Sequence, residues 1–357
     1  MAEEKRKFMK SDSSYDESFR AEYLHPRYWG LWLLAPLLFI FAWMPVCLRD
    51  AIGRLIGSLV LKFSGRQSEV AMVNLRIMRK ELTDPERREI IRKSVQIGMC
   101  GLLAYGEPFF LPKSMLMRRW NPVGKEYLDE AVKSGKTIIF MIPHTWTIDC
   151  CGLYLSAIGL PMTTMMHSSR NDLMDWYMNR LRLRFGGKVF ERGASLRPVI
   201  RSLREGNHFY YLPDEDLGKD YPSLFVPLFG TRKATLDMLP KLAKVSGAAV
   251  VPMLATYNMK TRRYDVVFER MYDNFPSGDN TADAARMNRS IESLLEGRIE
   301  QYMLFLRFYQ TRPEGEKWEP YYWLSRQRWR ARLAGGKPDD PAVYTMPEDE
   351  GGGKVRI

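Results

Sequence analysis

The sequence predicts an α/β protein with a mostly parallel central sheet flanked by helices. Short apolar, β-branched segments alternate with amphipathic helical segments between residues 137 and 299. Such alternation is typical of a parallel sheet whose strands are joined by helices. A run without any charged residue lies ahead of this region, between Arg27 and Arg49. We therefore expect an α/β region preceded by an N-terminal membrane helix.

Length and charge restrict the possible functions. With 357 residues and 45% hydrophobic content, the chain can bury a full core in one large or two modest domains. Its formal net charge of +12 favours an acidic partner, such as nucleic acid, an acidic or phosphorylated substrate, an acidic protein or anionic lipid. The four cysteines lack paired metal-site spacing, so we expect reduced thiols in a cytoplasmic setting.

The N-terminal part is expected to contain a polar segment and a membrane segment. Residues 1–27 are polar and predicted to be loosely ordered. Residues 28–48 are long enough, at 1.5 Å per residue, to match the hydrocarbon core of a bilayer, and tryptophans lie near both ends. Basic residues flank both sides, so the sequence does not decide between a spanning and a re-entrant segment.

Residues 49–316 are predicted to form the main domain. Helices are expected through 49–120, with a proline-containing first turn at Asp84-Pro85. Strands are then predicted at 137–142, 162–166, 188–190, 209–212, 248–257 and 264–268, and helices at 172–185, 196–205, 235–246 and 281–299. Residues 225–235 are read as an apolar turn leading into a helix, and 317–357 as a C-terminal extension that is partly disordered.

One candidate catalytic residue follows the first of these strands. The strand at 137–142 ends at Pro143 and delivers His144 to its carboxyl end, the edge at which α/β sheets bind ligands. Asp149 follows five residues later, and a turn between the two would let a carboxylate hold the imidazole of a general base. A capping aspartate and an ordinary loop histidine are the alternative explanation.

Two further polar clusters lie near strand or helix ends. Arg180, Arg182 and Arg184 alternate near the end of a predicted helix, so one or two of them could face a site and bind an anion. Ordinary solvated helix charges are the alternative explanation. Asp214, Glu215 and Asp216 follow the strand at 209–212. They are nearly contiguous and have no neighbouring histidine, so orienting a substrate or pairing with arginines is favoured over metal binding.

No motif indicates a nucleotide cofactor. The chain contains neither a glycine-rich dinucleotide motif after a strand nor a phosphate-binding loop. Cofactor binding is therefore not expected.

Together these motifs resemble the late acyltransferases of bacterial lipid A biosynthesis. The resemblance rests on His-x4-Asp after a strand, Asn-x-Leu-x-Asp-Trp, Arg-x-Arg-Phe-Gly-Gly, Tyr-Leu-Pro-Asp-Glu-Asp and Phe-Val-Pro-Leu-Phe-Gly. It extends to Ser-Phe-Arg at 18–20, His-Pro-Arg-Tyr-Trp-Gly at 25–30, Glu-Gln-Tyr at 300–302 and Thr-Arg-Pro at 311–313. Residues 15–316 are covered. The N-terminal motif and His-Thr-Trp-Thr-Ile-Asp at 144–149 are more similar to the myristoyl-adding branch than to the lauroyl-adding branch.

The resemblance implies a glycerolphosphate-acyltransferase-like fold and a specific reaction. An acyl chain, typically myristoyl, would pass from acyl carrier protein to the hydroxyl of a 3-hydroxyacyl chain on a Kdo-bearing, phosphorylated lipid A precursor. His144 is implied as the general base and Asp149 as the residue that orients its ring, while Arg182 and Asp214 match positions near the pocket. The implied location is the cytoplasmic side of the bacterial inner membrane, without a cofactor, metal or nucleic-acid partner.

Other functions remain open on the sequence. A lauroyl-type lipid A acyltransferase, or an acyltransferase acting on another glycolipid or a glycerolipid, would share His-x4-Asp. A membrane-anchored lipid-binding protein would use the basic surface without catalysis. Acyl chain length, the acylated position and the oligomeric state are not predicted.

Overall fold

The computed structural model describes residues 14–169, 171–192 and 195–335. Residues 346–357, the part of the C-terminal extension that is predicted to be disordered, lie outside this range, as do the first thirteen residues of the polar N-terminal segment.

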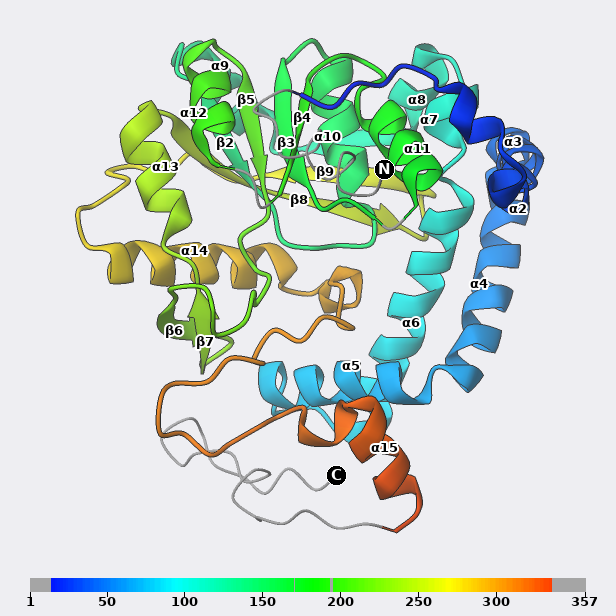
Figure 1. Cartoon of the computed structure of the whole chain (residues 1–357). Coiled ribbons are helices and arrows are strands. Elements are labelled where there is room, and N and C mark those ends of the chain that lie inside the picture. The colour runs from blue at the N-terminus through cyan, green and yellow to red at the C-terminus, as the bar shows by residue number, and fades with distance from the viewer. Residues whose placement is uncertain (1–13, 170, 193–194, 336–357) are drawn as a thin grey trace.

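The seven-stranded sheet confirms the predicted α/β class (Figure 1). Its order is β1-β9-β8-β2-β5-β3-β4. The strands are β1 (Trp120–Val123), β2 (Ile138–Met141), β3 (Met162–Met166), β4 (Lys188–Glu191), β5 (His208–Tyr211), β8 (Ala249–Asn258) and β9 (Arg263–Phe268). Only the β8–β9 pairing is antiparallel, so the sheet is mostly parallel.

Helices cover both faces of the sheet. They are α5 (Gly65–Met78), α6 (Asp84–Leu103), α7 (Glu107–Phe110), α8 (Lys113–Arg119), α9 (Lys125–Lys133), α10 (Ile148–Ala157), α11 (Asp172–Arg182), α12 (Arg197–Arg204), α13 (Met238–Ser246) and α14 (Asn280–Leu295). Side chains alternate along β2 with period two: Ile139 and Met141 pack in one core, and Ile138 and Phe140 pack in the other. Because both faces are covered, β2 is fully buried.

The register between β2 and β5 positions the predicted site. The two strands are parallel neighbours, and Met141 pairs with Tyr211. His144 and Asp214 each lie three residues beyond that pair. The sheet therefore brings the two residues to the same edge, although 70 positions separate them in the chain.

Residues 225–235 form a hairpin, so the predicted turn into a helix is wrong. β6 (Leu224–Leu228) pairs with β7 (Thr231–Thr235) in a separate two-stranded sheet. The connecting Phe229 and Gly230 have φ values of 50° and 74°. Two consecutive positive φ angles fit the turn that best matches the twist of a two-residue hairpin.

The expected single membrane helix over residues 28–48 is not formed. The segment is divided among α2 (Trp29–Trp32), α3 (Leu34–Trp43) and the start of α4 (Val46–Phe63). Met44 is extended because it precedes Pro45, whose ring disfavours a helical conformation at the preceding residue. In the parts of the chain that the structure describes, no helix has both the length and the apolar character needed to cross a membrane.

Helices α2, α3 and α4 nevertheless carry many exposed apolar side chains. Leu33 is 71% exposed and Phe63 is 88% exposed. We define the apolar face of α2–α4 as Trp29, Leu33, Leu34, Leu37, Phe39, Ile40, Trp43, Leu48, Leu55, Leu59, Val60 and Phe63. Exposed apolar side chains gathered on neighbouring helices are typical of a protein or membrane interaction site.

The other side of α4 packs closely against α6 (Figure 1). Gly53 and Gly57 on α4 contact the α6 backbone at Cys100 and Gln96, and a Cβ atom on Gly57 would lie 2.9 Å from Gln96 Cα. Arg49 on α4 is fully buried and forms a 2.7 Å ion pair with Glu107. The helix carrying the apolar face is thus fixed to the main domain by close packing and a buried charge pair.

Short helices complete the described chain. The N-terminal ones are η1 (Ala21–Leu24) and η2 (Pro26–Tyr28), and the C-terminal ones are η3 (Ile299–Gln301), η4 (Tyr322–Leu324) and α15 (Arg326–Leu333). Trp318 and Tyr321 are buried in the main core. The Tyr321 hydroxyl donates to Asn74 on α5, so the segment around residue 320 packs onto the same core.

Candidate active site

A cleft of about 630 Å³ opens at the carboxyl ends of β2, β3 and β5. His144, Asp149 and Arg182 line it, which brings three of the predicted site residues together. Its remaining walls are largely apolar, with Met162, Met165, Met166, Leu183, Leu196, Phe209, Leu212, Leu236, Met238 and Leu242. The cleft therefore combines a polar end with apolar walls, and its volume is in the usual range for small-molecule sites.

His144 lies in the loop between β2 and α10, and backbone contacts fix this loop. The Met303 amide donates to the His144 carbonyl at 2.9 Å, and the Trp146 amide donates to the Gln301 carbonyl at 3.3 Å. A β-bridge between Thr145 and Tyr302 adds a further link. The C-terminal segment around η3 thus holds the histidine loop against the end of the sheet.

Asp214, rather than Asp149, holds the His144 ring. Its Oδ1 lies 2.5 Å from His144 Nδ1, and its Oδ2 accepts the His144 backbone amide at 2.8 Å. The predicted contact from Asp149 to the ring is not formed, because the β2–β5 register places the buried Asp214 directly beside it. With Nδ1 engaged, Nε2 is the nitrogen available on the cleft side.

His144 and Asp214 shift each other's pKa in opposite directions. Burial alone would lower the pKa of His144, but the charge and hydrogen bond of Asp214 outweigh burial and raise this pKa above its ordinary value. Burial likewise opposes ionisation of Asp214, yet His144 holds the pKa of this carboxyl below its usual range. Each group therefore favours the charged form of the other.

Asp149 instead forms a second polar cluster. It lies in the first turn of α10 and accepts from Arg182 Nε at 2.8 Å and from the Tyr105 hydroxyl at 2.7 Å. Burial opposes the ionisation of Asp149, but Arg182 and Tyr105 lower its pKa overall. Asp149 thus fixes the Arg182 guanidinium at the cleft wall.

The remaining members of the two sequence clusters have separate partners. Arg180 pairs with Glu17 at 3.2 Å, and Arg184 donates to the Leu111 carbonyl, so Arg182 is the one of the three arginines that lines the cleft. Glu215 pairs with Arg192 at 2.5 Å. Asp216 accepts the Thr311 amide and hydroxyl, both at 2.6 Å.

Sequence reasoning missed three side chains around these clusters. Tyr105 was not singled out as a partner of Asp149. Lys233 on β7 is fully buried near Asp214; burial lowers the Lys233 pKa, and the nearby carboxylates oppose this effect. Tyr302 is also buried, and burial together with Asp214 raises its pKa well above the ordinary value. The Glu-Gln-Tyr motif at 300–302 was the available signal for Tyr302, whereas nothing in the sequence linked Lys233 to Asp214.

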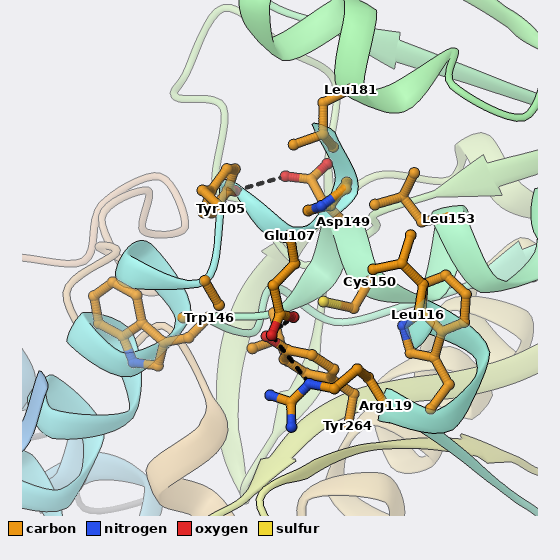
Figure 2. Close-up of a pocket in the computed structure, with 15 residues that line it drawn as sticks. Tyr105, Glu107, Leu116, Arg119, Trp146, Asp149, Cys150, Leu153, Leu181 and Tyr264 are labelled. Carbon is orange, nitrogen blue, oxygen red and sulfur yellow. Dashed lines mark hydrogen bonds and ion pairs between the residues drawn. The ribbon is translucent and has the colours of Figure 1, made fainter. Parts of the chain in front are cut away.

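Figure 2 shows a second, smaller pocket that shares Asp149 and Leu153 with the cleft. Tyr105 and Asp149 meet at one end, and Glu107 pairs with Arg119 at 3.0 Å at the other. Its volume of about 30 Å³ suits about two water molecules. The larger cleft is therefore the one with room for an extended apolar ligand.

The described residues contain no group of three or more His, Cys, Asp or Glu side chains arranged to hold a metal ion.

Comparisons with known proteins identify the family. Residues 17–311 match the family described as bacterial lipid A biosynthesis acyltransferase. A lipid A biosynthesis acyltransferase of Haemophilus influenzae is 37% identical over 302 residues, covering 85% of this chain and 94% of that protein. The Escherichia coli myristoyltransferase of the same pathway is 32% identical, covering 87% of this chain and 96% of that protein; the lauroyltransferase is 29% identical, covering 83% and 96%. The chain therefore belongs to the bacterial lipid A biosynthesis acyltransferase family and is an O-acyltransferase.

Proposed function

We propose that this enzyme transfers a myristoyl chain from acyl carrier protein to the hydroxyl of a 3-hydroxyacyl chain on a Kdo-bearing lipid A precursor. The observation that carries the proposal is the His144–Asp214 pair at the polar end of an apolar cleft. The N-terminal motif at residues 25–30 favours myristoyl over lauroyl transfer.

His144 is proposed to act as the general base. Its Nε2 takes the proton of the acceptor hydroxyl while the hydroxyl oxygen attacks the thioester carbon, and Asp214 stabilises the resulting imidazolium through Nδ1. Collapse of the tetrahedral intermediate breaks the carbon–sulfur bond, and the imidazolium returns its proton to the departing thiolate. The transfer requires no covalent acyl-enzyme.

Arg182 is proposed to stabilise the oxyanion that develops on the thioester carbonyl. Its guanidinium lies on the cleft wall with His144 and is held by Asp149. The start of α10 provides backbone amides and the positive end of a helix dipole beside it. Asp149 has an indirect role in this proposal, since it fixes Arg182 rather than His144.

The enzyme is proposed to act at the cytoplasmic side of the bacterial inner membrane. The apolar face of α2–α4 supports this location, because burying it in the interfacial layer would remove a large apolar area from water. The net charge of +12 favours recruitment of an acidic carrier protein.

The test is acyl transfer by the purified enzyme, with mass spectrometry of the lipid product. The wild type should add one acyl chain, and the added mass should identify the donor. We expect His144→Ala to lower the transfer rate by about two orders of magnitude or more, the usual contribution of a general base. Arg201→Ala is the control, because Arg201 is exposed on α12 and does not line the cleft. Unchanged turnover in His144→Ala would exclude the proposed base, and transfer to a different lipid would exclude the proposed acceptor.

A further inference from the structure

A second large concavity lies apart from the catalytic cleft, between α4, α6, β8 and η3. Its volume is about 650 Å³, and it shares no lining residue with the cleft. We define it as the basic groove, after its five cationic side chains Arg54, Arg92, Lys93, Lys260 and Arg298. Two carboxylates, Asp265 and Glu300, also line it.

The cations of the basic groove are only partly neutralised. Arg92 pairs with Glu89 at 2.5 Å, and Lys93 lies 3.9 Å from the same carboxylate. In the described part of the chain, Arg54, Lys260 and Arg298 have no carboxylate oxygen within 4 Å, and Glu269 attracts Arg298 from further away. Asp265 is engaged by the amides of two asparagines, Asn121 at 2.8 Å and Asn258 at 3.1 Å. The groove thus retains an excess of positive charge around an open volume.

The basic groove adjoins the apolar face of α2–α4. Arg54 and Ser58 lie one turn apart on the same flank of α4, and Ser58 accepts a hydrogen bond from the groove residue Gln96 on α6 at 2.9 Å. The exposed Leu55 and Leu59 follow Arg54 and Ser58 in the sequence, and each lies about 100° further round the helix axis. A ligand in the groove would therefore have an anionic group beside the cations and apolar chains beside the exposed leucines. This combination fits an anionic amphiphile.

The basic groove is also close to the catalytic loop. Gln301 lines the groove, and its carbonyl accepts the Trp146 amide. Two residues later, the Met303 amide bonds to the His144 carbonyl. Two residues of extended chain and one hydrogen bond separate the Gln301 backbone from the His144 carbonyl, so these two lie within roughly 10 Å of each other. A lipid head group in the groove can therefore belong to the molecule whose acyl chain reacts at His144.

We propose that the basic groove binds a phosphate group on the sugar head group of the lipid acceptor. This assignment rests on the proposed function for the identity of the acceptor. Guanidinium and ammonium groups from separate elements suit the several oxygens of a phosphate. The groove is a concavity of head-group size beside an apolar surface, which favours a lipid over the broad, flatter contact that a carrier protein needs.

The test compares two double variants of equal charge in the full-length enzyme. Lys260→Gln/Arg298→Gln removes two groove cations, and Lys133→Gln/Lys136→Gln removes two exposed lysines near the start of β2, at the opposite edge of the sheet. We expect the groove variant to raise the KM for the phosphorylated acceptor at least tenfold and to leave the KM for acyl carrier protein within twofold. The control variant should change neither constant by more than twofold.

Binding supplies a readout that is independent of transfer. His144→Ala should bind neutral detergent micelles containing the phosphorylated acceptor, and adding the groove substitutions should weaken this binding about tenfold. Both proteins, His144→Ala with and without the groove substitutions, should bind micelles with the dephosphorylated acceptor equally well.

Three outcomes would overturn the assignment. An increase in the donor KM alone would show that the groove docks the carrier protein. Equal weakening on micelles that contain phosphatidylglycerol in place of the acceptor would show general attraction to anionic lipid. Unchanged KM values for both substrates would show that the groove cations bind neither substrate and only face solvent. A wild-type enzyme without transfer activity would refute the proposed function. The binding measurement would still show whether the basic groove binds the phosphate group.

Discussion

Replacing Asp214 by asparagine tests which carboxylate serves the proposed catalytic histidine. Asp214 Oδ2 accepts the His144 amide, and Oδ1 contacts Nδ1. In Asp214→Asn the side-chain oxygen can still accept the backbone amide. The new amide nitrogen then faces Nδ1 as a donor, which favours the tautomer with the proton on Nε2. The nitrogen that should accept the substrate proton is then already protonated.

The expected loss is large. A charge-assisted hydrogen bond contributes about 1.5–3 kcal/mol, or roughly ten- to hundredfold in rate at 1.36 kcal/mol per factor of ten. The wrong tautomer adds to this, because the base must first exchange its proton. We therefore expect kcat/KM to fall by about 10² to 10⁴, the range of a displaced general base.

The pH profile of kcat/KM distinguishes loss of the Asp214 contact to His144 from a general loss of activity. The base works when deprotonated, so kcat/KM rises with pH through the His144 pKa. Asp214 raises that pKa above the ordinary histidine value, so loss of the carboxylate in Asp214→Asn should move the rising limb to lower pH. Asp149→Asn should lower activity through Arg182 and leave the limb in place, since Asp149 contacts Arg182 rather than His144.

The assay is initial-rate acyl transfer between pH 5 and 9, with thermal unfolding of each variant measured alongside. Asp220→Asn is the matched control, because Asp220 is exposed and lies outside the cleft. A limb that moves in Asp149→Asn and stays fixed in Asp214→Asn would refute the assignment of Asp214.

Two further predictions concern packing and charge. Gly57→Ala should lower the free energy of unfolding by about 1–3 kcal/mol in denaturant titration, because the new Cβ would press on the α6 backbone at Gln96. Gly30→Ala is the control and should show no such loss, since no atom lies within 4 Å of the Cβ position there. Equal behaviour of the two variants would refute the packing argument. Raising salt from 0.1 to 1 M shortens the Debye length from about 10 to 3 Å and should raise the KM for acyl carrier protein about tenfold, while a protein-free acyl thioester should be unaffected; an unchanged KM would show that charge does not recruit the donor.

The sequence was informative wherever a local pattern sufficed. The β-branched run before Pro143 predicted a buried strand and placed His144 at its end, and the observed β2 confirms the strand. The three aspartate and glutamate residues after 209–212 were also placed correctly at a strand end. The pairing of His144 with Asp214 was missed, because it depends on β5 lying next to β2, and strand order is a long-range property that neither segment encodes alone.

The other errors come from local backbone conformations that hydropathy does not report. Hydropathy across residues 28–48 suggested one helix, but the local conformation at Met44 and Pro45 divides it. Phe229 at positive φ is rare for an aromatic residue, so the hairpin at 224–235 had no strong turn signal before its glycine.

The contacts of the histidine loop also determine when during synthesis the proposed catalytic pair can assemble. His144 depends on Asp214 and on the backbone of Met303, both of which are translated after it. At about 5–20 residues per second, roughly 10–30 s pass between the synthesis of His144 and that of Met303. Helices α4 and α6 precede His144 and can pack during this interval, whereas the base cannot be fixed in place. The amino-terminal helices can therefore take up their packing before the His144–Asp214 pair can form.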